Sequence, residues 1–413
     1  MDVKRDIKQA MDQLGIDKLR RHQLKPISSI CSARDTFVLA PTSSGKSAIY
    51  QIPALLHANQ ITVVLEPTLA LMHDQTRKLR VLGIAAEYMD SAMTKSERTD
   101  SLKRFQEGKV NILYITPERF VSESFLCILR GMKLFMLVVD ECHCVLDWGG
   151  SFRSDYLQIG EAINSLSERP VITALTATAS KEDIEQICTL LHMKKPAIFE
   201  NDLYRKNLIF IKKYADDRKA KLTLLYQYLK KYHTGCSIVY CNTKKAVDAV
   251  HELLEKRYPG KVCKCHSNMG AAKRASHELQ FLKGEKQIMV ATSAFGMGVD
   301  MGEVDLVIHF NMPLSVTDYV QQAGRAGRQG QKAHCVLLYS DDDYYIDRVI
   351  LSSIQDDSAK KRALNRLDEM KDYCDDTAHC QTGMLLRSFG QGQKKCCNRC
   401  TNCQKARRGG MGS

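Results

Sequence analysis

The sequence contains no apolar run long enough to cross a lipid bilayer, a span that needs about 20 consecutive apolar residues. Residues 1–6 lack the hydrophobic stretch with which a secretory signal would start. No short-period repeat or low-complexity segment occurs, which argues against a solenoid. We therefore expect a soluble, intracellular protein with no membrane partner. Its location would be the nucleus in a eukaryote and the cytoplasm or nucleoid in a bacterium.

The charges are unbalanced. Lys and Arg number 60 against 47 Asp and Glu, so the formal net charge is +13 and the pI is about 9.0. Such an excess is often no more than a solvated surface, but it also suits a polyanionic partner, nucleic acid before membrane. At 413 residues the chain is longer than one hydrophobic core usually serves, so we expect two or three domains.

Cysteine is abundant, with 16 residues that fall into two groups. Ten are scattered through apolar segments from Cys31 to Cys335, and we interpret them as buried free thiols in a reducing compartment. The other six crowd into the last forty residues, from Cys374 onward. This second group needs an explanation of its own.

Short apolar runs alternate with longer amphipathic stretches, such as residues 69–79 and 96–105. The runs that predict buried strands in the first half are 36–40, 61–65, 110–115, 134–139 and 171–175. After a polar stretch at 200–207, further strands are predicted at 237–241, 287–292, 306–310 and 333–339. This alternation predicts an α/β fold with two tandem, doubly wound parallel-sheet domains.

The same pattern suggests where the domains end. We expect the first domain at residues 1–202 and the second at 203–345. No strand pattern follows Asp343, and residues 359–374 have a helical spacing of apolar side chains. We therefore expect a small helical module at 346–408, followed by a flexible tail at 409–413 whose small residues are compatible with an artificial appendage.

Residues 40–47 follow the first predicted strand and precede a helical pattern, which is the context of a phosphate-binding loop. Backbone N–H groups at a helix N-terminus would face the phosphates. Lys46 would contact the β- and γ-phosphates, and the Ser47 hydroxyl would bind Mg²⁺. The other residues of this loop that we expect to bind the nucleotide are Thr42, Ser43, Ser44 and Gly45.

A chance Gly-Lys-Ser turn is the alternative, and a second element argues against it. The predicted strand at 134–139 ends on Asp140 and Glu141, where a Walker-B carboxylate belongs. Asp140 would hold Mg²⁺, and Glu141 would orient and deprotonate the attacking water. A solvated strand end could carry two acidic residues as well. With both elements present in this order, the sequence predicts a nucleotide-hydrolysing site.

Residues 321–328 place Arg325 and Arg328 three positions apart, which on a helix would put them on one face. A guanidinium fork from a second domain can neutralise charge on a transferring phosphoryl group. A Gly-Arg-rich turn alone would more often be a surface loop or a simple phosphate contact. Beside the two elements above, it predicts a sensor of the γ-phosphate.

Together these residues resemble a superfamily 2 helicase of the RecQ family, from about residue 15 to residue 403. The segments that match the family's motifs are 19–23, 66–75, 114–119, 174–179, 238–242 and 290–300. The resemblance implies two RecA-like domains and an ATP-dependent DNA helicase of 3′→5′ polarity. It also implies that Gln23 reads the adenine and that Arg328 is the arginine finger, with Arg325 in support.

Residues 144–156 resemble the aromatic-rich loop of RecQ proteins, which senses single-stranded DNA and licenses hydrolysis. Trp148 and Phe152 offer π-faces for bases, and Arg153 adds charge beside them. Without the family, the single tryptophan would more often be a core or surface aromatic residue. The residues that the resemblance implies in DNA contact or coupling are Thr68, His143, Trp148, Phe152, Arg153, Thr176, Thr178, Asn242 and Thr292.

Some positions depart from the family pattern. Ser43 and Ser44 replace glycines that are usual in the RecQ loop, which makes the turn stiffer. Cys142 stands where the family mostly has Ala, away from the chemistry. Glu66 stands where Ser is common, close to the expected DNA track, where it could weaken a contact. None of these departures removes a catalytic group.

The terminal cysteines have metal-ligand spacing. Cys397, Cys400 and Cys403 form two overlapping Cys-x-x-Cys steps, which indicate a structural zinc site more strongly than disulfides in a reducing compartment. The RecQ zinc module implies Cys380 as the fourth ligand, with Cys374 or Cys396 as substitutes. Four thiolates leave no open position for a catalytic water.

A second metal site could be suggested by the segment 263–266, where two cysteines precede a histidine. The segment has the alternation of a strand and falls on a family motif, so we interpret it as ordinary strand sequence.

The expected function is ATP-dependent unwinding by a monomer that acts on single-stranded and tailed duplex DNA, with ATP, Mg²⁺ and structural Zn²⁺ as cofactors. One alternative is a DNA-stimulated ATPase, translocase or strand-annealing factor that unwinds weakly. It gains support because the sequence stops soon after the cysteines and leaves no residues for the winged-helix domain of many RecQ proteins. The other alternative is a non-catalytic nucleic-acid-binding module, against which the intact Lys46, Glu141 and Arg328 argue.

Overall fold

Continuous apolar runs form the central strands of the protein. In the computed structural model, β2 (Ile61–Leu65), β5 (Leu134–Val139) and β6 (Val171–Thr176) are buried along their whole length. Burial on both faces is typical of parallel sheets that are covered by helices on each side. The structure describes residues 3–41, 44–90, 93–146, 153–293, 295–296, 303–392 and 395–409. The chain divides into two compact units, Met1–Asp202 and Leu203–Ser413.

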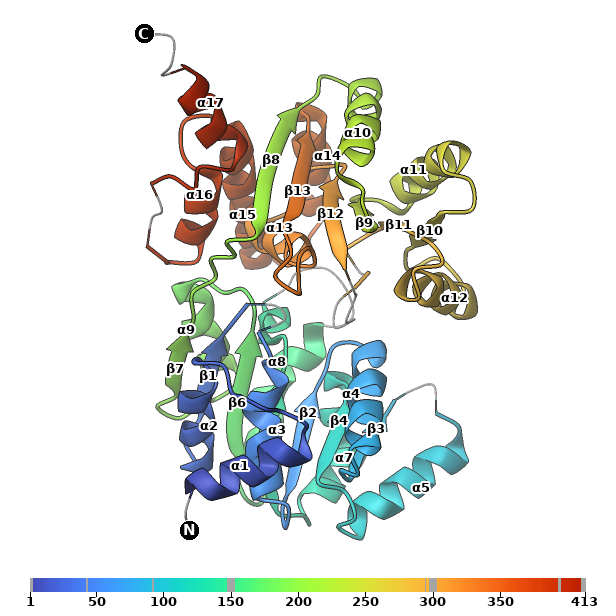
Figure 1. Ribbon diagram of the computed structural model, residues 1–413. Helices are drawn as coiled ribbons and strands as arrows, with labels where there is room; N and C mark the ends of the chain where they lie inside the picture. The colour runs from blue at the N-terminus through green and yellow to red at the C-terminus, as the bar shows by residue number, and fades with distance from the viewer. Residues whose placement is uncertain are drawn as a thin grey trace. The chain divides into compact units, whose positions relative to one another are not determined.

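The first unit contains a parallel sheet with the strand order β3-β4-β2-β5-β6-β1-β7 (Figure 1). Its remaining strands are β1 (Thr36–Leu39), β3 (Ala86–Met89), β4 (Ile112–Ile115) and β7 (Ala197–Glu200). The carboxyl ends of parallel strands lie at one edge of the sheet, and in such folds the ligand site lies at that edge.

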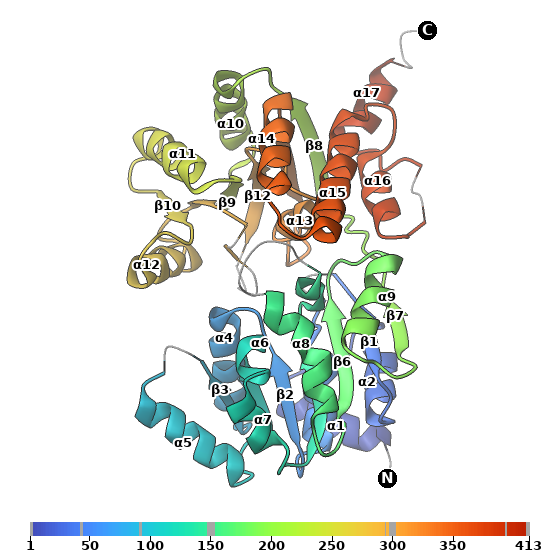
Figure 2. The ribbon, with the colours of Figure 1, turned by 180° about the vertical axis from the view of Figure 1, so that it is seen from behind.

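Helices cover both faces of this sheet. On the face seen in Figure 1 lie α1 (Val3–Gln13), α2 (Leu24–Cys31), α3 (Ser47–Leu56) and α4 (Leu69–Val81). On the opposite face, seen in Figure 2, lie α6 (Pro117–Phe120), α7 (Glu123–Leu129), α8 (Arg153–Asn164) and α9 (Lys181–Leu190). The remaining elements of this unit are α5 (Lys95–Gln106) and the 3₁₀ helix η1 (Cys142–Val145).

The second unit contains a parallel sheet with the strand order β10-β11-β9-β12-β13-β8. Its strands are β8 (Leu208–Tyr214), β9 (Cys236–Tyr240), β10 (Val262–Cys265), β11 (Ile288–Ala291), β12 (Val304–His309) and β13 (Ala333–Tyr339). On one face α10 (Arg218–Tyr232) and α11 (Lys244–Arg257) pack against the sheet. The other face packs against α12 (Ala271–Leu282), α13 (Val316–Ala323) and α15 (Asp357–Asp375).

The C-terminal helices continue this second core. They are α14 (Asp341–Ser352), α16 (Gln381–Ser388) and α17 (Thr401–Gly409). The terminal cysteines Cys380, Cys397, Cys400 and Cys403 belong to the same buried cluster as the apolar side chains of α13 and α15. The helical module is therefore packed onto the second sheet through a shared core. Within the described ranges, no helix is both long enough and apolar enough to cross a membrane.

The predicted fold class, two doubly wound parallel-sheet domains with a small helical module, is confirmed, and the predicted strands are all present within a few residues. The prediction missed β3, β7 and β8, and it noted β10 only as a strand-like alternation. These four are the strands at the sheet edges. An edge strand has a neighbour on one side only, so its sequence need not be continuously apolar, as the alternating burial of β7 illustrates.

Candidate functional site

The phosphate-binding loop joins β1 to α3, and Thr42 and Ser43 of this loop lie outside the described residues. Gly45 has a φ of +79°, a left-handed conformation that favours glycine. A Cβ at this position would also lie only 2.8 Å from Gln23 Nε2. Lys46 then leads directly into α3, which begins at Ser47. The N-terminus of a helix that follows such a loop is a general site for phosphate.

Two side chains that precede α2 brace this loop. Gln23 Nε2 donates to Gly45 O at 2.8 Å, and Gln23 Oε1 accepts from the backbone N–H of Arg20 at 2.6 Å. His22 Nε2 lies 3.1 Å from Ser44 O. Burial lowers the pKa of His22, although the hydrogen bond to Ser44 opposes the shift, so a neutral ring donates to this carbonyl. The amide of Gln23, which the family resemblance associates with the adenine, thus also sets the shape of the loop.

A pocket of about 630 Å³ lies beside the braced loop. Its lining includes Ile16, Arg20, Gln23, Gly45, Gln51 and Leu79. Small-molecule sites commonly have volumes of roughly 300–1,000 Å³. The pocket is therefore large enough for the base of a nucleotide whose phosphates lie at the loop.

Lys46 and Glu141 form an ion pair between the loop and the acidic strand end. Lys46 Nζ lies 3.3 Å from Glu141 Oε1, and the two side chains are 9% and 18% exposed. Burial lowers the pKa of Lys46, but the carboxylates of Glu141 and Asp140 outweigh that effect, and the net shift of the pKa is upward. Lys46 therefore stays protonated, as a phosphate-binding lysine must.

Asp140 follows β5 and is buried. It accepts a hydrogen bond from the Glu141 N–H at 2.8 Å. Burial raises the pKa of Asp140, and the charge of Lys46 opposes the shift. Glu141 has a φ of +46°, which is uncommon for a residue other than glycine and turns the chain from β5 into η1. Unusual backbone conformations of this kind cluster at functional sites.

Glu66 adds a third carboxyl group near Asp140 and Glu141. It is fully buried and shares a side-chain hydrogen bond with Asp140, while no N–H or hydroxyl group of the described residues donates to its carboxyl oxygens. The expectation that Glu66 weakens a DNA contact is wrong, because its side chain has no surface to offer. Divalent cations such as Mg²⁺ prefer oxygen ligands, so this group of carboxyls fits one.

His143 and Thr176 connect the acidic strand end to the next strand. His143 Nδ1 lies 3.0 Å from Thr176 Oγ1 and 3.5 Å from Glu141 Oε2. Thr176 Oγ1 in turn donates to Thr178 O at 3.1 Å, and the Thr178 N–H donates to Thr176 Oγ1 at 3.3 Å. All these side chains except Glu141 are buried. A polar chain therefore runs from Glu141 to the loop after β6.

The arginines of the second unit are not on a helix, and that part of the prediction is wrong. Helix α13 ends at Ala323, and the residues from Gly324 onward form successive turns. Gly327 has a φ of +60°, and glycine has a low helix propensity, so the helix cannot continue through this segment. Arg325 is buried and donates from Nη1 to Gly296 O. Arg328 is partly exposed.

Arg205 and Asn207 hold these turns in place, and the sequence analysis missed both. Arg205 donates to Gly324 O at 2.6 Å and to Ala326 O at 2.9 Å, and it also donates to Gly327 O. Asn207 Nδ2 lies 2.8 Å from Gly327 O. Both residues lie in the polar stretch 200–207, whose sequence resembles that of a linker. No local pattern shows that this stretch bonds to residues 120 positions away.

Other expected DNA-contact residues have varied surroundings. Asn242 follows β9, and its Nδ2 donates to Met312 O at 2.7 Å and to Asp347 Oδ2 at 2.8 Å. The donor side of this amide is therefore engaged within the second unit. Thr68 is the N-cap residue of α4. Thr292 follows β11 and donates its N–H to Cys265 O at 3.2 Å.

Of the aromatic-rich loop, the structure describes only the two ends, which lie in or next to η1 and α8. Trp148 and Phe152 lie outside the described residues, as does the side chain of Arg153, whose backbone begins α8. The segment 263–266 that could have suggested a second metal site forms β10 and the residue after it. There His266 Nε2 lies 3.2 Å from Asp248 Oδ1.

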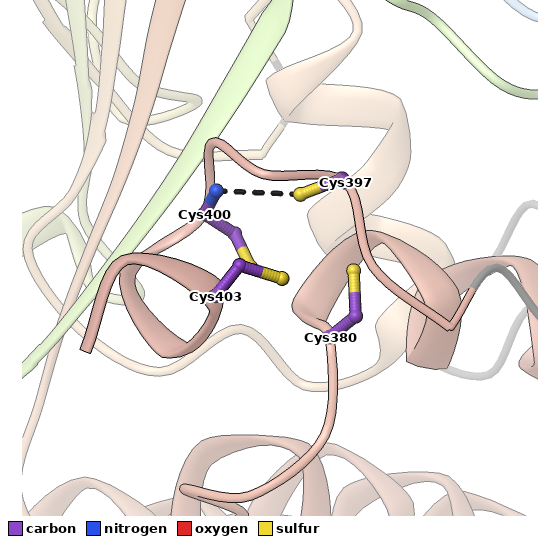
Figure 3. A group of neighbouring side chains, drawn as sticks. All are labelled: Cys380, Cys397, Cys400 and Cys403. Atoms are coloured by element: carbon purple, nitrogen blue, oxygen red, sulfur yellow. Dashed lines mark hydrogen bonds between the residues drawn. The ribbon is translucent and has the colours of Figure 1, made fainter. Parts of the chain in front are cut away.

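Four cysteines come together in the C-terminal module (Figure 3). They are Cys380, Cys397, Cys400 and Cys403, which are all buried and whose sulfur atoms all lie within 4.8 Å of one another. Cys374 is buried in α15, and Cys396 is exposed; neither belongs to this group. The spacing of the four sulfurs fits one tetrahedral zinc ion, whose Zn–S bonds are about 2.3 Å long.

The backbone favours thiolates at these positions. The Cys400 N–H donates to Cys397 Sγ at 3.3 Å, and Asn398 between them has a φ of +60°, which asparagine tolerates better than most residues. The hydrogen bond from the Cys400 thiol lowers the pKa of Cys397 and raises the pKa of Cys400, so Cys397 is the first of this pair to ionise. Cys380 is the N-cap residue of α16, an end of a helix that stabilises negative charge.

Protein-family comparisons match nearly the whole chain. A DEAD/DEAH box helicase domain matches residues 20–187, a helicase conserved C-terminal domain matches 220–330, and a RecQ zinc-binding domain matches 341–404. The ATP-dependent DNA helicase RecQ of Bacillus subtilis is 36% identical over 394 residues, which are 95% of this chain. The chain belongs to the RecQ family of helicases.

Other RecQ-family relatives are similar over the same region. The ATP-dependent DNA helicase RecQ of Pasteurella multocida is 30% identical over 94% of this chain, and the mouse ATP-dependent DNA helicase Q5 is 34% identical over 90%. The chain spans 66% of the length of the B. subtilis protein, 60% of the P. multocida protein and 40% of the mouse protein.

Solved helicase structures share the fold. The DEAD-box helicase Mss116 bound to single-stranded RNA has a TM-score of 0.68 at 18% identity, covering 87% of this chain and 80% of its own. The DUF1998 helicase MrfA bound to DNA has a TM-score of 0.65 at 20% identity, covering 94% of this chain and 59% of its own. These likenesses confirm the RecA-like fold of the two sheets.

The expected cofactors, zinc, ATP and Mg²⁺, agree with the domains that the family comparisons match. The zinc-binding domain together with the four clustered cysteines confirms the expectation of structural zinc. ATP and Mg²⁺ fit the DEAD-type helicase domain, which contains the loop at Lys46 and the carboxylates at Asp140 and Glu141.

Proposed function

We propose that this chain is an ATP-dependent DNA helicase of 3′→5′ polarity, which couples ATP hydrolysis to translocation on single-stranded DNA and to duplex unwinding. The observation that carries the proposal is the partly buried Lys46–Glu141 pair, joined through His143 to Thr176, in a member of the RecQ family. That arrangement would supply a charged site for hydrolysis, together with a chain of hydrogen-bonding side chains that leads from this site to Thr176.

Each residue of the nucleotide site has a role in this proposal. Lys46 attracts the β- and γ-phosphates, and the Ser47 hydroxyl and Asp140 hold the cation. Bound Mg²⁺ would neutralise negative charge on the phosphate oxygens. Glu141 accepts a proton from the attacking water. In the absence of nucleotide, its ion pair with Lys46 holds the Glu141 side chain in position.

The loop residues Thr42, Ser43, Ser44 and Gly45 contribute backbone contacts to the phosphates, and Gln23 contacts the adenine. The side chain of Ser44 supports this proposal, because its Oγ is buried without a hydrogen-bond partner among the described residues. A donor left free at a phosphate-binding loop is available to an anion.

Coupling to DNA is the second part of the proposal. We expect Thr68, Trp148, Phe152, Arg153, Asn242 and Thr292 to contact DNA. His143, Thr176 and Thr178 would relay DNA binding to Glu141, and their hydrogen bonds support that role. For Asn242 the carbonyl oxygens of the side chain and backbone are the groups to consider, since its side-chain Nδ2 and its backbone N–H already donate to other residues.

Arg328, with Arg325 in support, would supply positive charge to the γ-phosphate. The bonds from Arg205 to the intervening carbonyls support this role, because they give the arginine-bearing turns a defined shape. A guanidinium that is held in place loses less side-chain entropy when it binds an anion.

The zinc ligands in this proposal are Cys380, Cys397, Cys400 and Cys403. We place the domain boundaries after residues 202 and 345, with the zinc module at 346–408. The working form would be a monomer acting on single-stranded and tailed duplex DNA inside the cell. The net charge of +13 supports a nucleic-acid partner.

The test is a strand-displacement assay on duplexes that carry either a 3′ or a 5′ single-stranded tail, run beside an ATPase assay. We expect ATP-dependent displacement from the 3′-tailed duplex and none from the 5′-tailed duplex, with hydrolysis stimulated by single-stranded DNA. Lys46→Ala serves as the inactive control.

Other outcomes point to other functions. Strong DNA-stimulated hydrolysis without strand displacement would identify a translocase or annealing factor. Binding to DNA without any hydrolysis would identify a non-catalytic module. Displacement from the 5′-tailed duplex alone would contradict the polarity.

A further inference from the structure

Glu66 occupies a position that the proposed catalytic roles do not use. It directly follows β2, which pairs in parallel with β5 and places Leu65 opposite Val139. The next residues along the two strands are Glu66 and Asp140, and the ladder continues there, because the Asp140 N–H donates to Leu65 O at 3.1 Å. Residues opposite each other in register project from the same face of a sheet. Glu66 therefore shares a face with Asp140.

That face is the one covered by α3, the helix that begins beside Lys46. Val64 and Val138 belong to the same buried cluster as Tyr50 of α3, and each lies two residues before one of the two carboxyls. The negative charge of Glu66 is among the causes that raise the pKa of Tyr50, after burial and the neighbouring Tyr114. The Glu66 side chain thus lies beneath α3, in the region of the phosphate-binding loop.

The partner of Glu66 in this region is another carboxyl group, that of Asp140, with which its side chain shares a hydrogen bond. No N–H or hydroxyl group of the described residues donates to its buried carboxyl oxygens. The nearby hydroxyls of Tyr50 and Tyr114 lie 3.4 Å from each other. Lys46, the cation of the site, is paired with Glu141. Two buried carboxyl groups can share a hydrogen bond only if one of them keeps a proton, and a cation between them would take the place of that proton.

A divalent cation is the ligand whose chemistry matches. Three carboxyls, Glu66, Asp140 and Glu141, gather around one lysine, and burial together with the charges of Asp140 and Glu141 raises the pKa of Glu66 well above its usual range. Among the described residues, the four cysteines are the only group of three or more acidic, histidine or cysteine side chains whose ligand atoms all lie within 4.8 Å of one another. The three carboxyls are therefore too far apart to ligate one ion directly together. Mg²⁺ commonly keeps several of its waters in proteins, and such waters can reach a more distant carboxyl.

We infer that Glu66 is a positioning residue of the cation site, which binds a water of the divalent cation held by Asp140 and so retains the cation before the nucleotide arrives. This inference rests on the proposed nucleotide site and adds a residue to it. Serine, the residue usual at this position in the family, could not supply the charge.

The test measures Mn²⁺ binding to the full chain without nucleotide, by the electron paramagnetic resonance signal of free Mn²⁺. Asp140→Asn identifies the binding that belongs to this site, since the thiolate cluster does not favour Mn²⁺. We expect Glu66→Gln to weaken this binding by roughly 10- to 100-fold, the usual effect of losing an outer-shell partner of a metal. Glu118→Gln, which removes a carboxylate just beyond the neighbouring strand β4, is the matched control and should bind as the wild type does.

The inference is overturned if Glu66→Gln binds Mn²⁺ as tightly as the wild type, or if the wild type has no binding that depends on Asp140. Should Glu66→Gln not fold, as judged by circular dichroism, Glu66→Ser gives the same comparison with the smaller residue. The DNA-stimulated ATPase activity of the wild type at saturating Mg²⁺ is measured separately. Hydrolysis with no nucleotide-free Mn²⁺ site would overturn only the role of Glu66, whereas an intact Mn²⁺ site without hydrolysis would overturn only the proposed function.

Discussion

His143 Nδ1 lies 3.0 Å from Thr176 Oγ1, and both side chains are buried. The bond joins the 3₁₀ helix after the acidic strand end to the last residue of β6. Because the same histidine lies 3.5 Å from Glu141 Oε2, a shift of the loop after β6 would be felt at the proposed general base. The proposed general base and the loop after β6 are thus connected through a single imidazole.

Removing the threonine hydroxyl should separate hydrolysis from DNA. Thr176→Val keeps the size of the side chain but leaves His143 without this partner. We expect the ATPase rate with single-stranded DNA to fall towards the rate without DNA, by roughly 10- to 100-fold for a lost positioning contact. Thr173→Val is the matched control, since this buried threonine of the same strand contacts Met136 Sδ. Equal DNA stimulation in both variants would exclude the relay.

Lys46→Ala should abolish ATP hydrolysis. The substitution removes the charge that contacts the phosphates and leaves Asp140 and Glu141 without their cation, so we expect kcat to fall by a factor of about 1,000 or more. Steady-state phosphate release measures the effect, and Lys181→Ala, an exposed lysine of the same unit, controls for the loss of charge. Turnover retained in Lys46→Ala would show that this loop is not the site.

Arg205→Ala should loosen the arginine-bearing turns. The guanidinium is partly buried and bonds to three backbone carbonyls, so its loss should cost about 3 kcal/mol of unfolding free energy. It should also lower the ATPase rate, because Arg325 and Arg328 lose their fixed positions. Lys206→Ala, at the exposed neighbouring position, should change neither quantity. Normal kcat in a destabilised Arg205→Ala would restrict Arg205 to folding alone.

Cys397→Ser should remove zinc and reduce the stability of the C-terminal module. Metal content by mass spectrometry should fall from one equivalent to well below one, because a three-thiolate site binds zinc less tightly. Cys396→Ser is an adjacent control, since its exposed thiol lies outside the sulfur cluster. If Cys396→Ser loses zinc instead, the ligand set is wrong.

His309 should make the second unit less stable in mild acid. Burial lowers the pKa of His309 to about 3, against a hydrogen bond with Gln322 that opposes the shift. Between pH 6.5 and 3 His309 is protonated in the unfolded chain but neutral in the folded protein. The free energy of unfolding therefore falls as the pH falls through this window. From pH 7 to pH 5 this group should cost about 2 kcal/mol.

The measurement is urea unfolding of the wild type and of His309→Asn at both pH values. The variant keeps a polar group that can bond to Gln322 but does not titrate. Its loss of stability between pH 7 and pH 5 should be smaller than that of the wild type by about the same 2 kcal/mol. Parallel pH dependence in the two proteins would contradict the role of His309.

Most of the fold could be predicted from the sequence, because the central strands are buried on both faces. Such strands must be continuously apolar, as the runs at 61–65 and 134–139 are, and their alternation with helical stretches is sufficient to predict a doubly wound sheet. The loop at Lys46 and the cysteine steps from Cys397 to Cys403 could also be predicted from the sequence, because their chemistry depends on residues that are near each other in the chain.

What depends on distant residues required the tertiary structure. The edge strands have partners on one side only, so their composition does not identify them. Only packing shows that four cysteines meet while Cys374 and Cys396 do not, and only the tertiary structure shows that long-range bonds from Arg205 hold the turns at Arg325 and Arg328. Glu66 is the sharpest case. Its sequence position suggested an exposed site near DNA, but pairing between β2 and β5 buries it beside Asp140, because register determines which side chains share a face.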